Sequence, residues 1–204
     1  MKVATVTITY NRLELTKQTI ESFNSKTYVD YHLFIDNGST DGTVEYLKDR
    51  YDHILLEKNY GIAYAFRNAV KHLSGFDFIL KLDNDVETVT DDIINKMLYF
   101  YKNNEMNFCC SPVDLNLDPA FAPPVLSRAN INGYDVSFVG HTGGAFQLIP
   151  YAVCDALCNE WIHLKAGDYM IGRYYRKHNY RPVYLLDLEM RHIGLNQTSP
   201  NYIL

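Results

Sequence analysis

The most constraining feature of this sequence is the regular alternation of strand and helix patterns through its first half. Short runs of apolar and β-branched residues predict strands at 2–10, 31–35, 53–57 and 76–82. Segments with helical spacing of apolar residues stand between them, at 12–23, 43–51 and 61–73. Strands that alternate with helices form parallel sheets, because each crossover helix returns the chain to the same end of the sheet. The sequence therefore predicts an α/β fold with a mostly parallel sheet flanked by helices.

The second half of the chain has a less regular pattern. Helices are predicted at 92–103 and 167–180, and strands at 134–140, 144–149 and 181–193, with a His-Thr-Gly-Gly turn between the first two of these strands. The segment that contains Pro112, Pro119, Pro123 and Pro124 predicts irregular structure, because proline lacks a backbone donor. A length of 204 residues suits a single domain, 1–204, in which this mixed half is stacked on the parallel half.

Composition and charge limit the partners and the compartment. The formal charge of −5 provides no basic surface for nucleic acid, so a nucleic-acid acceptor is the less favoured alternative and any polyanion must be held by local features. The four cysteines lack zinc-site spacing, and Cys154 and Cys158 have the spacing of one helix face, which predicts buried, reduced thiols. No signal-peptide core and no transmembrane segment is found in the sequence. We therefore expect a soluble, cytoplasmic protein.

Polar clusters follow three of the predicted strands, at 10–12, 36–41 and 83–85. Ligands of parallel α/β sheets bind at the carboxyl ends of the strands, where these clusters fall. The third cluster places Asp83, Asp85 and Glu87 within five positions, and like charges this close need either solvent or a cation. Mg²⁺ and Mn²⁺ take oxygen ligands and keep coordination positions open for substrate phosphates. The cluster predicts a site for a metal and a diphosphate; the plain alternative is a solvated strand end or a helix cap.

Four motifs occur in order through the first half: TYNR at 9–12, IDNGSTDGT at 35–43, NYGIAYAFRNAV at 59–70 and LDND at 82–85. Together they resemble the family 2 glycosyltransferases of the GT-A fold, and the stretches 142–149 and 167–185 resemble that family more loosely. The resemblance implies transfer of a sugar from a nucleoside diphosphate sugar, with a UDP-sugar as the first expectation, to an acceptor hydroxyl of unknown class. It also implies a divalent cofactor, Mn²⁺ or Mg²⁺, a Rossmann-like donor half at 1–90 and an acceptor half at 91–204.

The same resemblance implies roles for individual residues. Asp85 would bind the metal directly, Asp83 would contact the ribose and assist the metal through water, and His192 would complete the metal shell. Tyr10 would lie against the nucleobase and Asp36 would bond to its polar edge. The nucleotide site would also include Thr9, Arg12, Asn37, Arg67 and Asn68. Plain structural alternatives are a strand end for Tyr10, a turn cap for Asp36, a surface ion pair for Arg67 and a structural histidine for His192.

The acceptor side needs a general base if the transfer is inverting, as the resemblance implies. Asp168 is the implied base, although Gly167 stands where the family has a first carboxylate. The alternative for Asp168 is a helix cap, and the base would then be sought among Asp135, Asp155 and Glu160. Three residues of the predicted turn are expected to face the acceptor: His141, Gly143 and Gly144.

Two other function classes remain beside the transferase. A sugar nucleotidyltransferase should begin with a glycine-rich basic loop, which residues 7–15 lack. A non-catalytic relative that binds nucleotide sugars is the stronger alternative, because one carboxylate of the acidic pair is missing. The fingerprints of dinucleotide-binding and P-loop enzymes are absent from the sequence. The donor sugar and the oligomeric state are not predicted.

Overall fold

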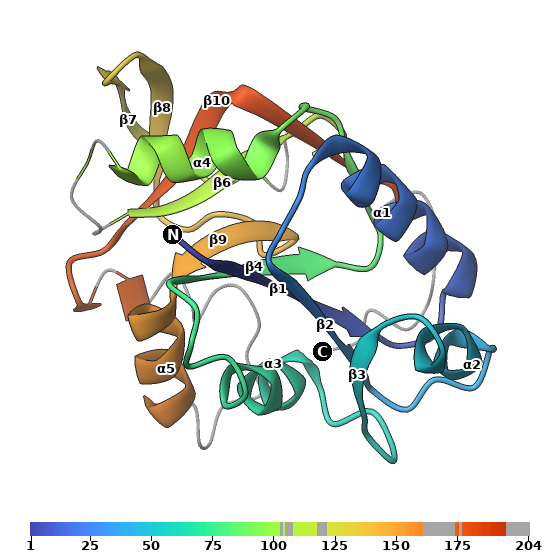
Figure 1. Ribbon diagram of the computed structural model, residues 1–204. Helices are drawn as coiled ribbons and strands as arrows, with labels where there is room; N and C mark the ends of the chain where they lie inside the picture. Colours follow the sequence, from blue (N-terminus) through green and yellow to red (C-terminus); the bar gives the residue numbers. More distant parts are fainter. Residues whose placement is uncertain (103, 105–107, 118–121, 161–173, 176, 195–204) are drawn as a thin grey trace.

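The computed structural model describes residues 1–102, 104, 108–117, 122–160, 174, 175 and 177–194 (Figure 1). The helices are α1 (Leu13–Lys26), α2 (Thr43–Lys48), α3 (Ile62–Val70), α4 (Ile93–Lys102) and α5 (Tyr151–Glu160). The strands are β1 (Val3–Thr9), β2 (Tyr31–Asp36), β3 (Asp52–Leu55), β4 (Phe78–Asp83), β5 (Val86–Thr88), β6 (Phe108–Asp114), β7 (Val125–Ile131), β8 (Tyr134–Val139), β9 (Phe146–Pro150) and β10 (Arg181–His192).

The described strands form one sheet, in the order β3-β2-β1-β4-β9-β6-β10-β8-β7, with β5 paired to β10. The strands β3, β2, β1 and β4 are parallel, as the alternating pattern of the first half predicts. Beyond β4 the sheet becomes mixed, because β9 is antiparallel to β4 and to β6, and β8 is antiparallel to β10 and to β7. The predicted fold class, a parallel half joined to a mixed half, is confirmed.

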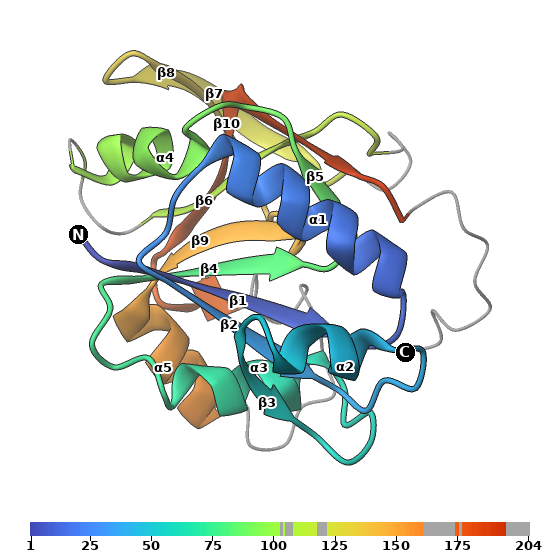
Figure 2. The same cartoon turned by 45° about the vertical axis from the view of Figure 1, so that its right-hand side comes forward.

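Helices cover both faces of this sheet (Figure 1, Figure 2). On one face α1 and α4 pack against the sheet through Phe23 and Phe100, and α2 adds Leu47 against β2. On the other face α3 and α5 pack through Phe66 and Leu157. Because β1 and β4 are covered on both sides, almost all of their residues are buried. This burial fixes the central strands, whose carboxyl ends carry the polar clusters.

The prediction of irregular structure around the prolines is wrong at its start. Pro112 lies inside β6 and pairs with Leu185 of β10. Proline is tolerated there because the pairing of β6 with β10 shifts register immediately after Leu185, and β9 contacts β6 in register only at Cys110. Two further strands were also not predicted: β5, which has only three residues, and β7, which begins directly after Pro124.

The four cysteines are buried free thiols, and Cys154 and Cys158 lie on α5 as their spacing predicts. Burial raises the pKa of all four thiols. None of the helices in the described ranges has the length and apolar character needed to cross a membrane. The helix predicted at 167–180 lies largely outside the described residues.

Candidate active site

Three loops begin level with one another at one edge of the sheet. Thr9 at the end of β1 is in register with Asp36 at the end of β2, and Ile8 is in register with Asp83 at the end of β4. Since the three strands are parallel, the loops that follow them leave from the same edge. The predicted polar clusters are therefore brought together by the fold.

Hydrogen bonds join the loop after β1 to the loop after β2. The backbone N–H of Asn11 donates to the Ser39 hydroxyl at 2.7 Å, and the N–H of Thr40 donates to Oδ1 of Asn11 at 2.8 Å. Asn11 and Arg12 both have left-handed backbone, with φ of 57° and 65°. Such conformations are uncommon outside glycine, so the bonds that hold Asn11 support this sharp turn before α1.

Asp41 anchors the start of α1 from the neighbouring loop. Its Oδ2 accepts the N–H of Leu13 at 2.9 Å, and its Oδ1 accepts the Thr43 hydroxyl at 2.6 Å. Burial acts to raise the pKa of Asp41, but the hydrogen bonds from Thr43 and Leu13 lower it by more, so the net shift is downward. A carboxylate at these helix starts also satisfies backbone donors that have no partner within their helix.

Asp85 is the buried centre of the site. It is only 2% exposed, and its two carboxylate oxygens have different cationic neighbours. Oδ2 accepts a hydrogen bond from the Arg12 guanidinium at 2.7 Å, and Oδ1 lies 2.9 Å from Nε2 of His192. Burial acts to raise the pKa of Asp85, but the hydrogen bond with His192 and the charges of His192, Arg12 and Lys81 together lower it. Asp85 is therefore held in its charged form.

His192 is the last residue of β10 and reaches Asp85 from the far half of the chain. The backbone N–H of His192 donates to Oδ1 of Asp114 at 3.0 Å, and its Nδ1 lies 3.9 Å from Oδ2 of the same residue. Burial acts to lower the pKa of His192, but the hydrogen bond with Asp85 and the charges of Asp85, Asp83 and Asp114 raise it above its usual value. The imidazole thus lies between two carboxylates.

Gly194 packs directly on the Asp85 side chain. A Cβ added at Gly194 would lie 2.9 Å from Cβ and Cγ of Asp85 and closer still to Oδ2. The backbone N–H of Ile193 also donates to the Asp85 carbonyl at 2.8 Å. The end of β10 and the segment after it therefore cover Asp85 closely, and only a residue without a side chain fits at position 194.

Asp83, the first carboxylate of the motif, is paired with a buried lysine. Nζ of Lys81 donates to Oδ1 of Asp83 at 2.6 Å, and the Asp83 side chain is 29% exposed. Asn84 points toward α1, where its Nδ2 donates to the Thr16 hydroxyl at 3.1 Å. Asp83 is thus paired with Lys81, whereas Asp85 is paired with Arg12 and His192.

The residues predicted to hold the nucleobase fall into an exposed and a buried group. Tyr10 is 43% exposed at the edge of the site. Asp36 is fully buried, where its Oδ2 accepts the Thr9 hydroxyl at 2.9 Å and its Oδ1 accepts the N–H of Ser39 at 2.8 Å. Asn37 is also buried, and its side chain bonds to Asn59 in the loop after β3. Asp36 and Asn37 therefore shape the loops in this structure, and their contacts with a nucleotide stay predictions.

Arg67 and Asn68 lie on α3, where both are partly exposed. Nδ2 of Asn68 donates to the Tyr64 carbonyl of its own helix at 2.9 Å. Among the residues that the structure describes, no hydrogen bond or ion pair joins the Arg67 side chain to another side chain, so the surface ion pair considered as its alternative is not formed among them. The predicted nucleotide roles of these two residues remain predictions.

The predicted acceptor turn, residues 141–144, lies between β8 and β9. Side chains of described residues hold this turn: Lys81 donates to the Gly144 carbonyl at 2.5 Å, the Tyr184 hydroxyl accepts the N–H of Gly143 at 2.8 Å, and Gln147 donates to the Thr142 hydroxyl at 2.5 Å. Because Lys81 also binds Asp83, the turn is directly linked to the acidic motif. The predicted base, Asp168, and its neighbour Gly167 lie outside the described residues.

Sequence reasoning missed several members of this site. Lys81 interrupts an apolar strand directly before the acidic motif, and this was a usable signal because a lysine in a buried strand must be paired. Gly194 and Asp114 gave no comparable signal, since both reach Asp85 or His192 only through strand pairing between distant segments.

The pair of Asp85 and His192 fits a divalent cation. Carboxylate oxygen and imidazole nitrogen are ligands that Mn²⁺ accepts, and these two stand 2.9 Å apart. Within the described ranges no three His, Cys, Asp or Glu side chains are grouped so that they could hold a metal by themselves. Cations of this class are commonly bound through one or two protein ligands together with water and substrate phosphates, which agrees with such a pair.

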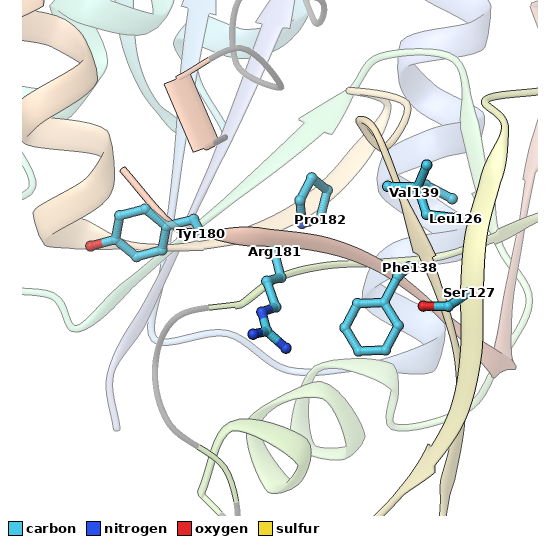
Figure 3. A pocket seen from close by; sticks show the side chains of 7 residues that line it. All are labelled: Leu126, Ser127, Phe138, Val139, Tyr180, Arg181 and Pro182. Atoms are coloured by element: carbon cyan, nitrogen blue, oxygen red, sulfur yellow. The ribbon is translucent and has the colours of Figure 1, made fainter. Parts of the chain in front are cut away.

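A separate cavity of about 340 Å³ lies at the opposite end of β10 from His192 (Figure 3). Its walls come from β7, β8 and the start of β10: Leu126, Ser127, Phe138, Val139, Tyr180, Arg181 and Pro182. It contains none of the predicted site residues. The strand-end cluster around Asp85, and not this cavity, carries the candidate chemistry.

Comparison with known proteins shows one family and a set of structural neighbours. The model of the family described as "Glycosyl transferase family 2" matches residues 5–173. A curated relative, glycosyltransferase AglJ of Haloferax volcanii, is 34% identical over 83 residues, which cover 41% of this chain and 27% of that protein. The chain thus corresponds to about a quarter of AglJ.

Solved glycosyltransferase structures share the fold across almost the whole chain. GalNAc-T7 with UDP, GalNAc and Mn²⁺ superposes with a TM-score of 0.70 at 11% identity, covering 94% of this chain and 44% of that one. The mannosyltransferase PcManGT of Pyrobaculum calidifontis, in complex with GDP-Man and Mn²⁺, gives 0.70 at 14% identity, with coverage of 97% and 58%. S. aureus TarS 1–349 with UDP-GlcNAc gives 0.69 at 16% identity, with coverage of 98% and 62%. The predicted GT-A fold is confirmed by these neighbours.

Proposed function

This chain belongs to glycosyl transferase family 2, and from that premise we propose that it transfers a sugar from a nucleoside diphosphate sugar to an acceptor hydroxyl with the help of a divalent metal. The observation that carries the proposal is the pairing of Asp85 with His192 at the carboxyl ends of the parallel strands. Neighbours of the same fold were solved with UDP or GDP-Man together with Mn²⁺. We propose a UDP-sugar as the donor and a cytoplasmic location.

On the donor side, Asp85 and His192 would hold the cation. When bound, the cation supplies Lewis-acid stabilisation of the charge that develops on the leaving diphosphate. Arg12, whose side chain is 23% exposed, adds a positive charge beside Asp85, and its planar guanidinium suits a phosphate. Asp83, 29% exposed and oriented by Lys81, would accept hydrogen bonds from the ribose.

At the base end of the donor site, Tyr10 offers an exposed ring for stacking on the nucleobase. Thr9, Asp36 and Asn37 would support this pocket by holding the loops after β1 and β2 in place. Arg67 and Asn68, on α3, would complete its wall. Stacking on the nucleobase and hydrogen bonds to its polar edge do not involve the metal. These contacts therefore contribute to nucleotide affinity even when no cation is present.

On the acceptor side, we propose an inverting reaction in which Asp168 removes the proton of the attacking hydroxyl. The hydroxyl would approach along the turn that contains His141, Gly143 and Gly144. The acceptor class follows from none of these residues, because selectivity among hydroxyls depends on the shape of the acceptor pocket.

A thermal-shift screen of nucleoside diphosphates and their sugars, with and without Mn²⁺, tests the donor proposal. A ligand at about a hundred times its dissociation constant raises the free energy of unfolding by about 2.7 kcal/mol. We expect UDP with Mn²⁺ to raise the melting temperature, and the rise to shrink in Asp85→Asn. If no nucleotide stabilises the protein with any divalent metal, the donor site is wrongly assigned.

A transfer assay separates the enzyme from a non-catalytic relative that only binds the donor. Labelled UDP-sugar is incubated with pooled acceptors, and label outside the donor is measured. Asp168→Asn should keep donor binding while transfer falls by about 10²–10⁴, the usual effect of losing a general base. Transfer at the unmutated rate would place the base elsewhere, with Asp135, Asp155 and Glu160 as the next candidates.

A further inference from the structure

Lys81 is a buried charge at the centre of the sheet. It is 2% exposed in β4, and its register partners are Val6 of β1 and Gln147 of β9. A buried ammonium is strongly unfavourable unless it is paired and hydrogen-bonded. A methionine of similar length would fill the same space without this requirement, so packing alone does not call for a lysine here.

The ammonium group of Lys81 has a partner on each side of the site. It donates to Oδ1 of Asp83 at 2.6 Å on the donor side, and to the Gly144 carbonyl at 2.5 Å on the acceptor side. These partners are 61 positions apart in sequence and belong to different loops. One charged group therefore joins the acidic motif to the acceptor turn, residues 141–144.

Two other side chains hold the same turn but do not touch the acidic motif in the hydrogen bonds described. Gln147 of β9 donates to the Thr142 hydroxyl at 2.5 Å, and the Tyr184 hydroxyl of β10 accepts the N–H of Gly143 at 2.8 Å. Gln147 lies opposite Lys81 in the antiparallel pair of β4 and β9, on the same face of the sheet. Gln147 is thus a matched neighbour: it is buried and polar, and it supports the turn without binding Asp83.

We propose that Lys81 is a positioning residue that couples the two sides of the site, by holding Asp83 and the acceptor turn in one arrangement. The proposal rests on the proposed function, since it assigns Asp83 to the donor and residues 141–144 to the acceptor. If donor binding moves Asp83, the ammonium group of Lys81 would move with it and would displace the Gly144 carbonyl. Donor binding would then align the acceptor turn before the hydroxyl attacks.

The first test measures UDP affinity in the presence of Mn²⁺ by calorimetry, for Lys81→Met and for Gln147→Met as the matched control. Loss of a charge-assisted hydrogen bond to Asp83 should weaken UDP by about 10- to 100-fold in Lys81→Met. Gln147→Met should leave UDP affinity within about twofold of the unmutated protein. Equal effects of the two changes, or no effect of Lys81→Met, would overturn the proposal.

A double-mutant cycle asks whether Lys81 acts through Asp83. If it does, Lys81→Met should weaken UDP little further in an Asp83→Asn background, because the carboxylate that it orients is already gone. If Lys81→Met instead weakens UDP by the same factor with and without Asp83→Asn, Lys81 stabilises the sheet in general and does not act through Asp83.

A third measurement needs no nucleotide, so it separates this proposal from the proposed function. Hydrogen exchange of the segment 141–147 in the ligand-free protein should become several-fold faster in Asp83→Asn, because the ammonium that holds the Gly144 carbonyl loses its charged partner. The backbone N–H of Asp83 donates to the Ala145 carbonyl at 2.8 Å, and this bond is kept in Asp83→Asn. The same Asp83→Asn change should have no such effect when Lys81→Met is already present. If Lys81→Met does not fold, Asp83→Asn alone decides: unchanged exchange at 141–147 refutes the coupling. Failure of the unmutated protein to bind any nucleotide would instead refute the proposed function.

Discussion

Gly194→Ala is expected to disturb the centre of the site through a single methyl group. The added Cβ would lie 2.9 Å from Cβ and Cγ of Asp85, whereas non-bonded carbon atoms pack at about 3.5–4.0 Å. The Asp85 side chain or the backbone at position 194 must therefore move by about 0.6 Å or more. The 2.7 Å bond of Asp85 to Arg12 and its 2.9 Å contact with His192 would lengthen or break. The backbone of Gly194 does not lie in the left-handed region, so alanine is disfavoured there by contact and not by conformation.

The expected magnitude follows from overpacking. Extra methyl groups forced into a packed site typically lower the free energy of unfolding by about 1–3 kcal/mol. We expect a value at the lower end of this range, because Arg12 can move its partly exposed guanidinium into water. In a domain of this size each kcal/mol lowers the melting temperature by about 2–4 °C. Mn²⁺ affinity should fall more strongly than stability, because the displaced carboxylate is the proposed ligand.

Thermal unfolding and Mn²⁺ titration in the presence of UDP provide the assay, with Gly75→Ala as the control. Gly75 has no atom within 4 Å of an added Cβ, and its backbone is also outside the left-handed region. Gly75→Ala should leave Mn²⁺ affinity unchanged and stability unchanged or slightly higher. If Gly194→Ala matches Gly75→Ala in both measurements, the close packing on Asp85 does not matter and the reasoning is refuted.

Three further outcomes are expected. Burial lowers the pKa of His32 to about 3, below its unfolded value of about 6.5, so the unfolded state binds the additional proton between these pH values. The free energy of unfolding should then decrease as the pH falls through that window, by at most about 1.4 kcal/mol per pH unit, and urea titrations of His32→Phe should lack this component. Asp41→Ala removes the acceptor of the Leu13 N–H, and chemical denaturation should show that the free energy of unfolding falls by about 0.5–2 kcal/mol. An unchanged free energy of unfolding would show that water replaces the cap. Tyr10→Ala should keep the fold, because the side chain is largely exposed, yet weaken metal-free UDP binding by about 10- to 100-fold; unchanged affinity would make Tyr10 a plain strand end.

The donor half of the fold was predictable because its signals are local. Buried parallel strands such as β1 and β4 are apolar runs bounded by polar clusters, and the helices between them have clear spacing. The mixed half depends on contacts that no local pattern encodes. The strand β6 was missed because Pro112 is normally a strand breaker, and its tolerance depends on the register shift in the partner strand β10.

The site was predictable to the extent that its residues belong to strand-end motifs. The register of β1, β2 and β4 brings the three predicted clusters together. His192 was also predicted near the metal, and the structure brings it to Asp85. By contrast, the close approach of Gly194 and the bond from Lys81 to Gly144 arise from packing between distant segments. Such contacts could not be foreseen from spacing along the chain.

The most direct test of the donor and metal site is a Mn²⁺ binding titration followed by electron paramagnetic resonance, in the presence of UDP. The signal of free Mn²⁺ reports how much metal remains unbound at each addition. The unmutated protein should bind about one Mn²⁺ per chain, and Asp85→Asn should lose that binding, because the carboxylate that is paired with His192 is the expected metal ligand. Equal Mn²⁺ binding by Asp85→Asn and the unmutated protein would contradict the account.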